Sequence, residues 1–559
     1  MSPVAAVVCS LIVYSLGYRF YAKHIATNLF ELTGKRETPA HTLEDGHDYV
    51  PCKRYVLFGH HYASIAGLAP MLGPAIAVMW GWVPAMVWVV LGTIFIGGVH
   101  DLSALAVSLR AKGKSIGKVA EAVIGQRAKS LFHVIIIFLI GLAMGVFVQV
   151  VSQLFSSSFY PEAVFPSVSL MVLAVAIGVL FYKKGVALGR LTIGGFVLTL
   201  IAVYLGGVLP TPDLAVPTWS YLLLGYAFVA SVLPVWLLLQ PRDFLNSLLL
   251  YLGLVAIFVG FALLRPSFVA PAFDPSPPGA PPLYPFVFIV IACGAVSGFH
   301  ALVSSGTTAK QLDKEQDAVF VSYGAMIGES LLGLAAVLAC TAGFASPAAW
   351  REHYSSWESA DGLASNLNAF ITGCGTFLSS LGVEPGLGKA FIALIAVSFA
   401  LTTLDSATRL LRYNIEEVAE TLAIPALGNR YVATAFAVGV IGSFALLELN
   451  GRPAGIALWA VFGTTNQVMA GLTLLTVTLY LYLRRKNYLY TAIPMVFMLV
   501  TTLIAMVSNV RTFFDQGSYL LLVVGGIVLL LAVWLVVEGV VRFARGRERA
   551  AAGVREVLG

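Results

Sequence analysis

The chain has 559 residues, of which 58% are hydrophobic and only 11% are charged. A soluble protein needs roughly a quarter of its residues charged, so this composition excludes a soluble multidomain protein and predicts an integral membrane protein. The net charge of +6 is too small for a nucleic-acid-binding protein, and no basic-aromatic patch accompanies it.

Apolar runs separated by polar residues, proline or glycine predict about fifteen transmembrane helices. Helices are favoured over a β-barrel because the runs are continuous and do not alternate in polarity. No basic segment precedes the first run, so we expect a retained helix and no cleaved signal peptide. The predicted spans are 4–21, 57–79, 84–108, 132–155, 168–182, 190–209, 219–239, 244–264, 284–303, 319–343, 388–404, 430–448, 455–481, 490–509 and 518–541.

Basic residues are very unevenly distributed between the connections. When the connections are assigned alternately to two sides, nearly all of the 34 Lys and Arg residues fall on one side. Because basic connections stay in the cytoplasm, we expect a multi-pass protein of the cytoplasmic (inner) membrane. Its N-terminus would lie outside and its C-terminus inside.

The span at 57–79 contains two adjacent histidines and two prolines (FGHHYASIAGLAPMLGPAIA). Proline and glycine near its middle free backbone carbonyls, which are tolerated at membrane depth where they line a cavity or bind a ligand. This pattern is typical of a discontinuous transporter helix, and a kinked packing helix is the alternative. The predicted substrate contacts are Gly59, His60, His61, Ser64, Gly67 and Gly73.

Ionisable residues at membrane depth cost about 2.5–3.5 kcal/mol each, which makes His100 and Asp101 notable. They form a proton relay, or they satisfy one another at a helix end. Five spans after the first interrupted helix, Gly225 and Pro234 interrupt another apolar run. This spacing predicts inverted repeats at 57–209 and 219–413.

A polar stripe marks the segment GAVSGFHALVSSGTT, with Ser297, His300 and Ser304 on one helical face. Its end is rich in glycine, serine and threonine, which suits an unwound segment that offers hydroxyls and amides to an anion. The predicted substrate contacts here are Ser297, Ser304, Ser305, Thr307 and Thr308.

Further polar residues follow in the later spans. Glu329 lies near the middle of its span, as a proton-coupling acid or as a protonated structural residue. Asp405 and Arg409 are predicted to form an i,i+4 ion pair, and Asn466 and Gln467 are predicted to make interhelical hydrogen bonds. The predicted proton-coupling residues are His100, Asp101, His300, Glu329 and Asp405.

Several of these segments resemble the carbon-starvation protein A (CstA) family. The resembling motifs are DGHDYVP (45–51), LFGHHYASIAG…GP (57–74), GGVHDLSALAVSLR (97–110), QPRDFLN (240–246), GFHALVSSGTTAKQL (298–312), YGAMIGES (323–330), TTLDSATRLLRY (402–413) and LWAVFGTTNQ (458–467). The resemblance implies a peptide or pyruvate/proton transporter. It also implies a LeuT-like 5+5 inverted-repeat core within an all-α polytopic protein.

The sequence thus predicts three parts: an N-terminal helix and loop at 1–56, a transporter core at 57–413, and C-terminal helices with a basic cytoplasmic tail at 414–559. The leading hypothesis is a proton-coupled importer of small peptides or of a small carboxylate such as pyruvate, active in carbon starvation. No segment has the spacing of a phosphate-binding P-loop, so an ion gradient must drive it.

Two other functions remain as alternatives. One is a passive channel. The other is a metal-binding membrane protein with zinc held by His60, His61, His100, Asp101 and His300. The five cysteines are scattered and form no CxxC pair, so they are interpreted as small apolar residues. No HExxH motif is present, and the sequence does not predict an enzyme.

Overall fold

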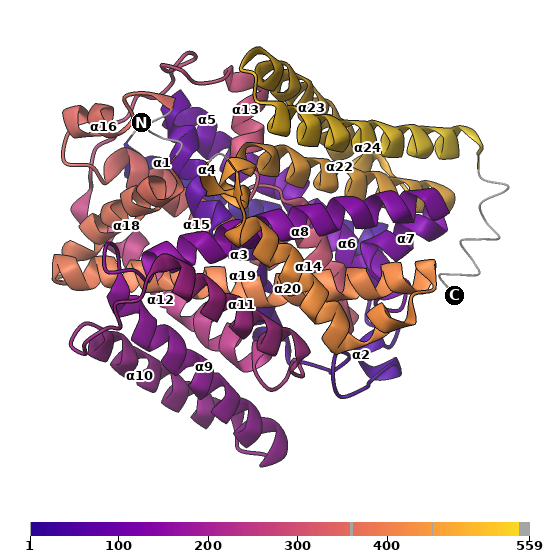
Figure 1. The fold of residues 1–559 in the computed structure, drawn as a ribbon, viewed down its shortest axis with the longest axis horizontal. Coiled ribbons are helices and arrows are strands. Elements are labelled where there is room, and N and C mark those ends of the chain that lie inside the picture. The colour runs from indigo at the N-terminus through magenta and orange to yellow at the C-terminus, as the bar shows by residue number, and fades with distance from the viewer. Residues whose placement is uncertain (1, 358–361, 450, 547–559) are drawn as a thin grey trace.

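Long apolar helices dominate the computed structural model, which describes residues 2–357, 362–449 and 451–546 (Figure 1). Among these residues, eleven helices are long and apolar enough to cross a membrane, or up to twelve if α3 and α4 count as one bent span. Two short strands of two residues each, β1 (Glu448–Leu449) and β2 (Arg452–Pro453), pair antiparallel. The predicted all-α polytopic membrane protein is therefore confirmed.

The helices are joined by connections of varied length, such as the long segment 265–282 between α12 and α13. Their bounds are α1 Pro3–Leu16, α2 Pro39–Thr42, α3 Arg54–Ala66, α4 Ala69–Ala77, α5 Trp82–Val87, α6 Gly98–Arg110, α7 Ile116–Val123, α8 Gln126–Leu154, α9 Val164–Gly178, α10 Leu188–Gly206, α11 Val216–Val232, α12 Leu239–Leu264, α13 Leu283–Val290, α14 Gly298–Gly306, α15 Gly324–Ala342, α16 Pro347–His353, α18 Leu363–Ser379, α19 Pro385–Leu422, α20 Arg430–Leu446, α21 Ala454–Ala457, α22 Trp459–Leu483, α23 Leu489–Asp515 and α24 Tyr519–Ala544.

Each predicted span corresponds to a helix or to an interrupted pair of helices. The count of about fifteen is an approximation, because α11 and α20 have only 17 residues each and α13–α14 is interrupted. The predicted basic tail beyond residue 546 lies outside the described residues.

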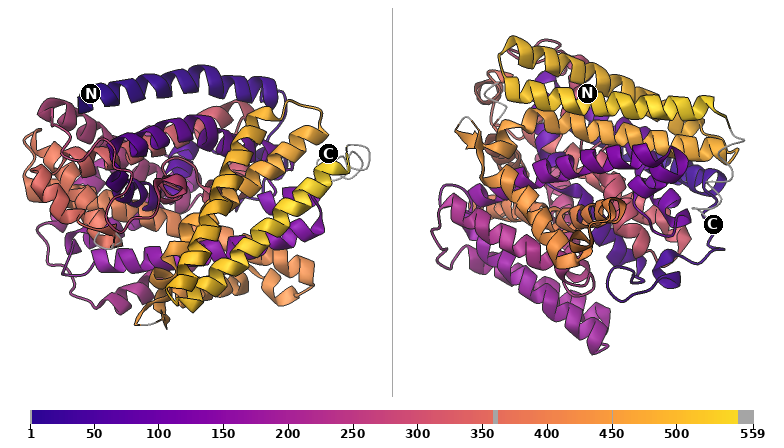
Figure 2. Two further views of the ribbon diagram at one scale, coloured as in Figure 1. Left: turned by 90° about the horizontal axis from the view of Figure 1, so that it is seen from above. Right: turned by 45° about the vertical axis from the view of Figure 1, so that its right-hand side comes forward.

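The centre of the bundle is built around α8 and α19, which lie side by side. Helix α19 is 38 residues long, and its far end reaches α7, where Ser115 donates to Glu417 at 2.7 Å and Lys118 to Glu420 at 2.8 Å. Helix α3 packs on α12, and α14 packs on α6 and α22. The hairpin α9–α10 lies at the lower edge of the bundle in Figure 1 and in the right view of Figure 2, where α9 packs on α12.

Two spans are broken near their middle. Helices α3 and α4 meet at a bend of 46° beside Gly67, as the sequence predicts. Helices α13 and α14 are separated by the non-helical residues 291–297. The prediction of a second break at Gly225 and Pro234 is wrong, because α11 continues through Gly225 and Pro234 follows its end.

Side chains from other elements satisfy the backbone of the 291–297 break. The indole of Trp88 donates to the carbonyl of Ile291 at 3.2 Å, and the hydroxyl of Thr93 donates to that of Gly294 at 3.2 Å. The amide of Gly294 donates to Glu329 at 3.2 Å. Non-helical backbone buried away from water requires such partners, which explains how this segment stays unwound at depth.

Candidate functional site

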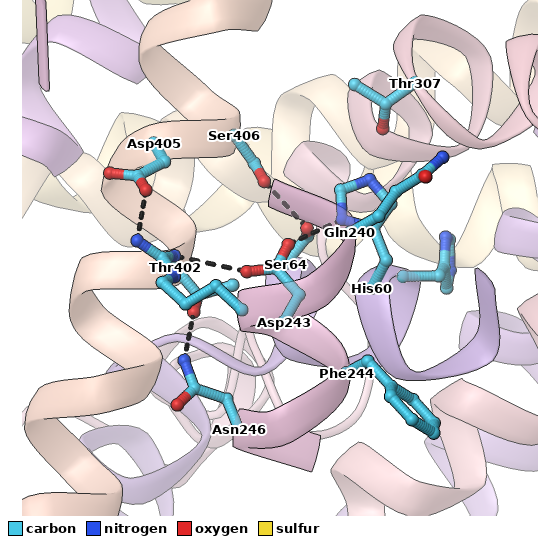
Figure 3. Close-up of polar contacts among 12 residues, drawn as sticks. His60, Ser64, Gln240, Asp243, Phe244, Asn246, Thr307, Thr402, Asp405 and Ser406 are labelled. Atoms are coloured by element: carbon cyan, nitrogen blue, oxygen red, sulfur yellow. Dashed lines mark hydrogen bonds and ion pairs between the residues drawn. The ribbon is translucent and has the colours of Figure 1, made fainter. Parts of the chain in front are cut away.

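The adjacent residues His60 and His61 form two separate buried pairs with aspartates. Consecutive side chains on a helix point in different directions, so the imidazoles reach different neighbours. Nδ1 of His60 lies 2.6 Å from Oδ2 of Asp243 on α12, a contact drawn in Figure 3, and Nε2 of His61 lies 2.8 Å from Oδ2 of Asp101 on α6. All four side chains are fully buried.

The pair of His61 and Asp101 belongs to a larger polar group between α3, α6 and α14. Ser304 donates to the second oxygen of Asp101, and Oγ1 of Thr308 lies 2.7 Å from Nδ1 of His61. The structure thus brings together four residues that the sequence predicts from three separate segments.

His100 does not join this group as predicted. Asp101 pairs with His61, although His100 is its neighbour in sequence, because the two side chains leave α6 in different directions. Within the described part of the chain, neither ring nitrogen of the fully buried His100 has a hydrogen-bond partner.

The pair of His60 and Asp243 continues into a buried charge network on α12. Arg242 lies 3.2 Å from Asp243 and also contacts Asp405 of α19. The hydroxyl of Tyr226 donates to Asp405 at 2.5 Å. One guanidinium between two carboxylates leaves a negative charge when all three are ionised. A proton on His60 would neutralise that charge.

The predicted ion pair between Asp405 and Arg409 does not form. Asp405 faces α12, whereas Arg409, one turn further along α19, faces the 45–51 loop and the end of α11. Arg409 donates to Asp48 at 3.0 Å and to the carbonyl of Ala230 at 2.9 Å. Charges on neighbouring elements therefore outcompete the local pairing.

Hydroxyl and amide groups surround the end of α3 near its break. Oγ of Ser64 lies 2.7 Å from Oγ of Ser406, and Thr403 donates to the carbonyl of Ser64 at 3.2 Å. Asn246 donates to Thr402 at 2.8 Å (Figure 3). A hydroxyl of α19 thus donates a hydrogen bond to a backbone carbonyl next to this break.

The other predicted substrate residues lie in helix contacts. A Cβ at Gly59 would lie 2.5 Å from Oγ of Ser247, so α3 and α12 touch there. Ser305 accepts from the amide of Ile116 at 3.1 Å, and Thr307 donates to a carbonyl of its own helix. Ser297 exchanges hydrogen bonds with Asn466. The predicted interhelical hydrogen bonds of Asn466 and Gln467 are confirmed, since Gln467 donates to Phe288 at 3.0 Å.

A second titratable group lies at the 291–297 break. Nε2 of His300 lies 3.4 Å from Oε2 of Glu329, and both side chains are fully buried. Cys293 lies beside this pair. Among the described residues, Cys293, His300 and Glu329 form a group that could hold a metal ion, because their potential ligand atoms all lie within 4.8 Å of one another. It shares only His300 with the predicted zinc ligands, which remain a prediction.

A cavity of about 390 Å³ opens beside the other halves of the two broken helices. Its walls come from α4, α13, α22 and α23, and Cys293 at the 291–297 break also lines it. Gly73 of α4 lines it too, and a Cβ there would lie 2.4 Å from the carbonyl oxygen of Val290. The cavity thus belongs to the α4 and α13 halves, whereas the two His–Asp pairs belong to the α3 half.

Sequence reasoning missed several members of these groups. The sequence does not predict Arg242 and Asp243 as site residues, because the predicted span begins at 244, after both charges. In the structure α12 begins at Leu239 and includes them. Their signal was the motif QPRDFLN itself. Cys293 has no partner pattern in the sequence, so only its position in space identifies it.

Comparisons with known proteins agree with this architecture. The sequence matches the family model described as "Carbon starvation protein CstA" over residues 2–351 and 343–505. It is 32% identical to the peptide transporter CstA of Bacillus subtilis, over 98% of each chain. It is also 32% identical to the pyruvate/proton symporter BtsT of Escherichia coli, over 90% of this chain and 81% of that protein.

The fold is similar to that of a solved transporter. A mutant of the Eremococcus coleocola manganese transporter superposes with a TM-score of 0.51 at 13% identity, covering 90% of this chain and 99% of that chain. The LeuT-like fold predicted from the sequence is thereby confirmed. The matches to the family model and to these relatives extend over most of the chain, and the chain belongs to the carbon starvation protein CstA family.

Proposed function

We propose that this protein is a secondary active transporter, and not an enzyme, that imports small peptides or a small carboxylate such as pyruvate together with protons. The relatives named as peptide transporters and as a pyruvate/proton symporter support this substrate range. We also propose a role in carbon starvation, which the family description supports.

The observation that carries the proposal is the double pair on the broken helix, in which His60 binds Asp243 and His61 binds Asp101. Histidine changes charge near neutral pH, and ionisable residues inside a membrane mark proton pathways. A proton gained or lost at either pair changes the attraction between α3 and its neighbour. Proton binding would thereby be coupled to the packing of α3, and through it to the rearrangement of the core that alternating access requires.

We assign the remaining proton-coupling roles to His100, Asp101, His300, Glu329 and Asp405, because these buried groups lie along α6, α14, α15 and α19. The substrate would bind between the breaks, with its carboxylate near backbone amides of the two breaks and the hydroxyls of Ser64 and Ser406. The cavity lined by Gly73 and Cys293 would be its entry from the α4 and α13 side.

The two breaks also support a division of the core. Repeats that open with the broken helices would begin at Arg54 and at Leu283, which we favour over the sequence-based start at 219. The bounds 1–56, 57–413 and 414–559 for the three parts of the chain remain a proposal. So do the cytoplasmic membrane and an outward N-terminus, which rest on the distribution of basic connections.

The test is uptake into proteoliposomes that contain the purified full-length chain. With an inside-alkaline pH gradient, labelled pyruvate or a labelled dipeptide should accumulate above equilibrium, and collapsing the gradient should release it. Unlabelled pyruvate, dipeptides and tripeptides then compete to identify the substrate class. Uptake that only equilibrates would support a passive channel, and competition by neither class would refute the proposed substrates.

A further inference from the structure

Cys293, His300 and Glu329 meet beside the 291–297 break, and the transport mechanism proposed above does not explain why a thiol belongs to this group. All three side chains are buried, and their potential ligand atoms lie within 4.8 Å of one another. Thiolate, imidazole and carboxylate are together the donor set of zinc and related divalent metals.

Two atoms of this group lack ordinary partners. Within the described residues, Nε2 of His300 and Oε2 of Glu329 are buried without a hydrogen bond, and they face each other at 3.4 Å. The other ring nitrogen, Nδ1 of His300, lies 3.0 Å from Sδ of Met326. A thioether only accepts, so Nδ1 carries a hydrogen, and Nε2 is the ring nitrogen that faces the carboxylate.

The separation of these two atoms fits a shared metal ion. Zinc lies about 2.0–2.1 Å from imidazole nitrogen and about 2.0–2.2 Å from carboxylate oxygen, so two tetrahedral ligands stand roughly 3.3–3.6 Å apart. The observed 3.4 Å lies within that range, whereas it is long for a charge-assisted hydrogen bond.

Neighbouring groups hold the potential ligands in place. The amide of Gly294 donates to Oε1 of Glu329 at 3.2 Å, which leaves Oε2 directed at His300. The side chain of Asn466 donates to Sγ of Cys293 at 3.6 Å, which stabilises sulfur as an acceptor. Such outer contacts orient metal ligands and tune their basicity.

We propose that Cys293, His300 and Glu329 bind one divalent metal ion of the zinc class, with the fourth coordination position open toward the cavity. Cys293 lines that cavity, which provides an entry path from the α4 and α13 side. The site goes beyond the proposed transport function, because His300 and Glu329 would act as ligands and not as proton carriers while the metal ion is bound. It also differs from the zinc ligands predicted from the sequence, with which it shares only His300.

The test uses the full-length chain in detergent after removal of metals with a chelator. Titration with Co²⁺ should produce one bound ion per chain, with the near-ultraviolet charge-transfer absorption of a thiolate ligand and the visible bands of a four-coordinate site. Zn²⁺ should then displace Co²⁺ and abolish both signals. Absence of stoichiometric Co²⁺ binding would overturn the proposal.

Variants identify the ligands. Cys293→Ser should abolish the thiolate absorption, and Glu329→Gln should weaken Co²⁺ binding at least tenfold. The matched control Cys340→Ser removes another buried thiol and should leave both signals intact. Thiolate absorption that survives Cys293→Ser, or that requires His61 instead, would overturn the assignment.

A measurement on the unaltered protein covers the case in which Cys293→Ser does not fold. Zn²⁺ should slow alkylation of Cys293 at least tenfold, as followed by mass spectrometry of the Cys293 peptide, while alkylation of the exposed Cys9 proceeds at the same rate. Equal rates at Cys293 with and without Zn²⁺ would contradict the site.

Discussion

Nδ1 of His60 lies 2.6 Å from Oδ2 of Asp243, and this contact joins the broken helix α3 to α12 inside the protein. The other oxygen of Asp243 faces Arg242 at 3.2 Å. One carboxylate is therefore shared by an imidazole of the broken helix and a guanidinium of α12. The contact between α3 and α12 thus belongs to a buried network of charged groups that continues to Asp405.

The central cation of this network should be essential for stability. Arg242→Gln leaves Asp243 and Asp405 buried without their shared cation, and removal of one partner from a buried ion pair costs about 3–5 kcal/mol. We expect a large fall in the apparent Tm in detergent, which the second change Asp405→Asn partly restores. The control Arg511→Gln removes an exposed cation and should change little. Equal Tm values for Arg242→Gln and the control would refute the network.

The pair of His61 and Asp101 should couple protons to transport. We expect His61→Gln to lower pH-driven accumulation roughly tenfold or more, because an amide side chain keeps hydrogen bonds to its neighbours but takes up no proton. Exchange of labelled for unlabelled substrate without a gradient should persist. The exposed His24 provides the control His24→Gln, which should retain both activities. Loss of exchange together with accumulation would indicate a folding or substrate role instead.

Asp48, in the loop before α3, should stabilise the protein at every physiological pH. Burial alone would raise the pKa of Asp48, but the hydrogen bond from His47 and the charges of Arg409 and Arg412 hold its pKa well below the usual range. A lowered pKa in the folded state contributes stability above the unfolded value of about 3.9, and that stability is lost only at still lower pH.

We therefore expect Asp48→Asn to cost about 1–3 kcal/mol, an amount that the partial exposure of Asp48 reduces. The difference in Tm from the unaltered protein should be the same between about pH 5 and pH 8, as measured by thermal unfolding in detergent. A difference that shrinks toward pH 5 would contradict the lowered pKa.

The close approach of α4 to α13 should require glycine at position 73. A Cβ there would lie 2.4 Å from the carbonyl oxygen of Val290, and overpacking of this kind costs about 1–3 kcal/mol. Gly73→Ala should therefore lower the Tm, whereas Gly225→Ala should not, because nothing lies within 4 Å of its Cβ. The same Tm for both variants would show that the backbones can separate freely.

The positions of the spans were predictable because burial in lipid leaves a continuous apolar run in the sequence. The first break was also predictable, since Gly67 and Pro70 mark it locally. The second was not, because residues 291–297 contain no proline and are held unwound by Trp88, Thr93 and Glu329 from elsewhere in the chain. Contacts between distant segments decide where that helix breaks.

In the candidate site, too, the sequence identifies some residues and does not identify the partners that they contact. His60, His61 and Asp101 were identifiable because a charge within an apolar run is costly and therefore conspicuous. Their partners depend on which helices touch, so the sequence suggested Arg409 for Asp405, where the fold supplies Arg242. Arg242 and Asp243 were placed outside the membrane by a rule that charges end a span. That rule fails where opposite charges neutralise one another.

Helix α19 is longer than a bilayer crossing requires. Its 38 residues extend about 57 Å at 1.5 Å per residue, nearly twice the roughly 30 Å of hydrocarbon. One continuous helix therefore connects Asp405, deep in the bundle, to the acidic last turns that accept hydrogen bonds from Ser115 and Lys118. A tilt of α19 about Asp405 would therefore displace these last turns relative to α7 and strain the contacts with Ser115 and Lys118.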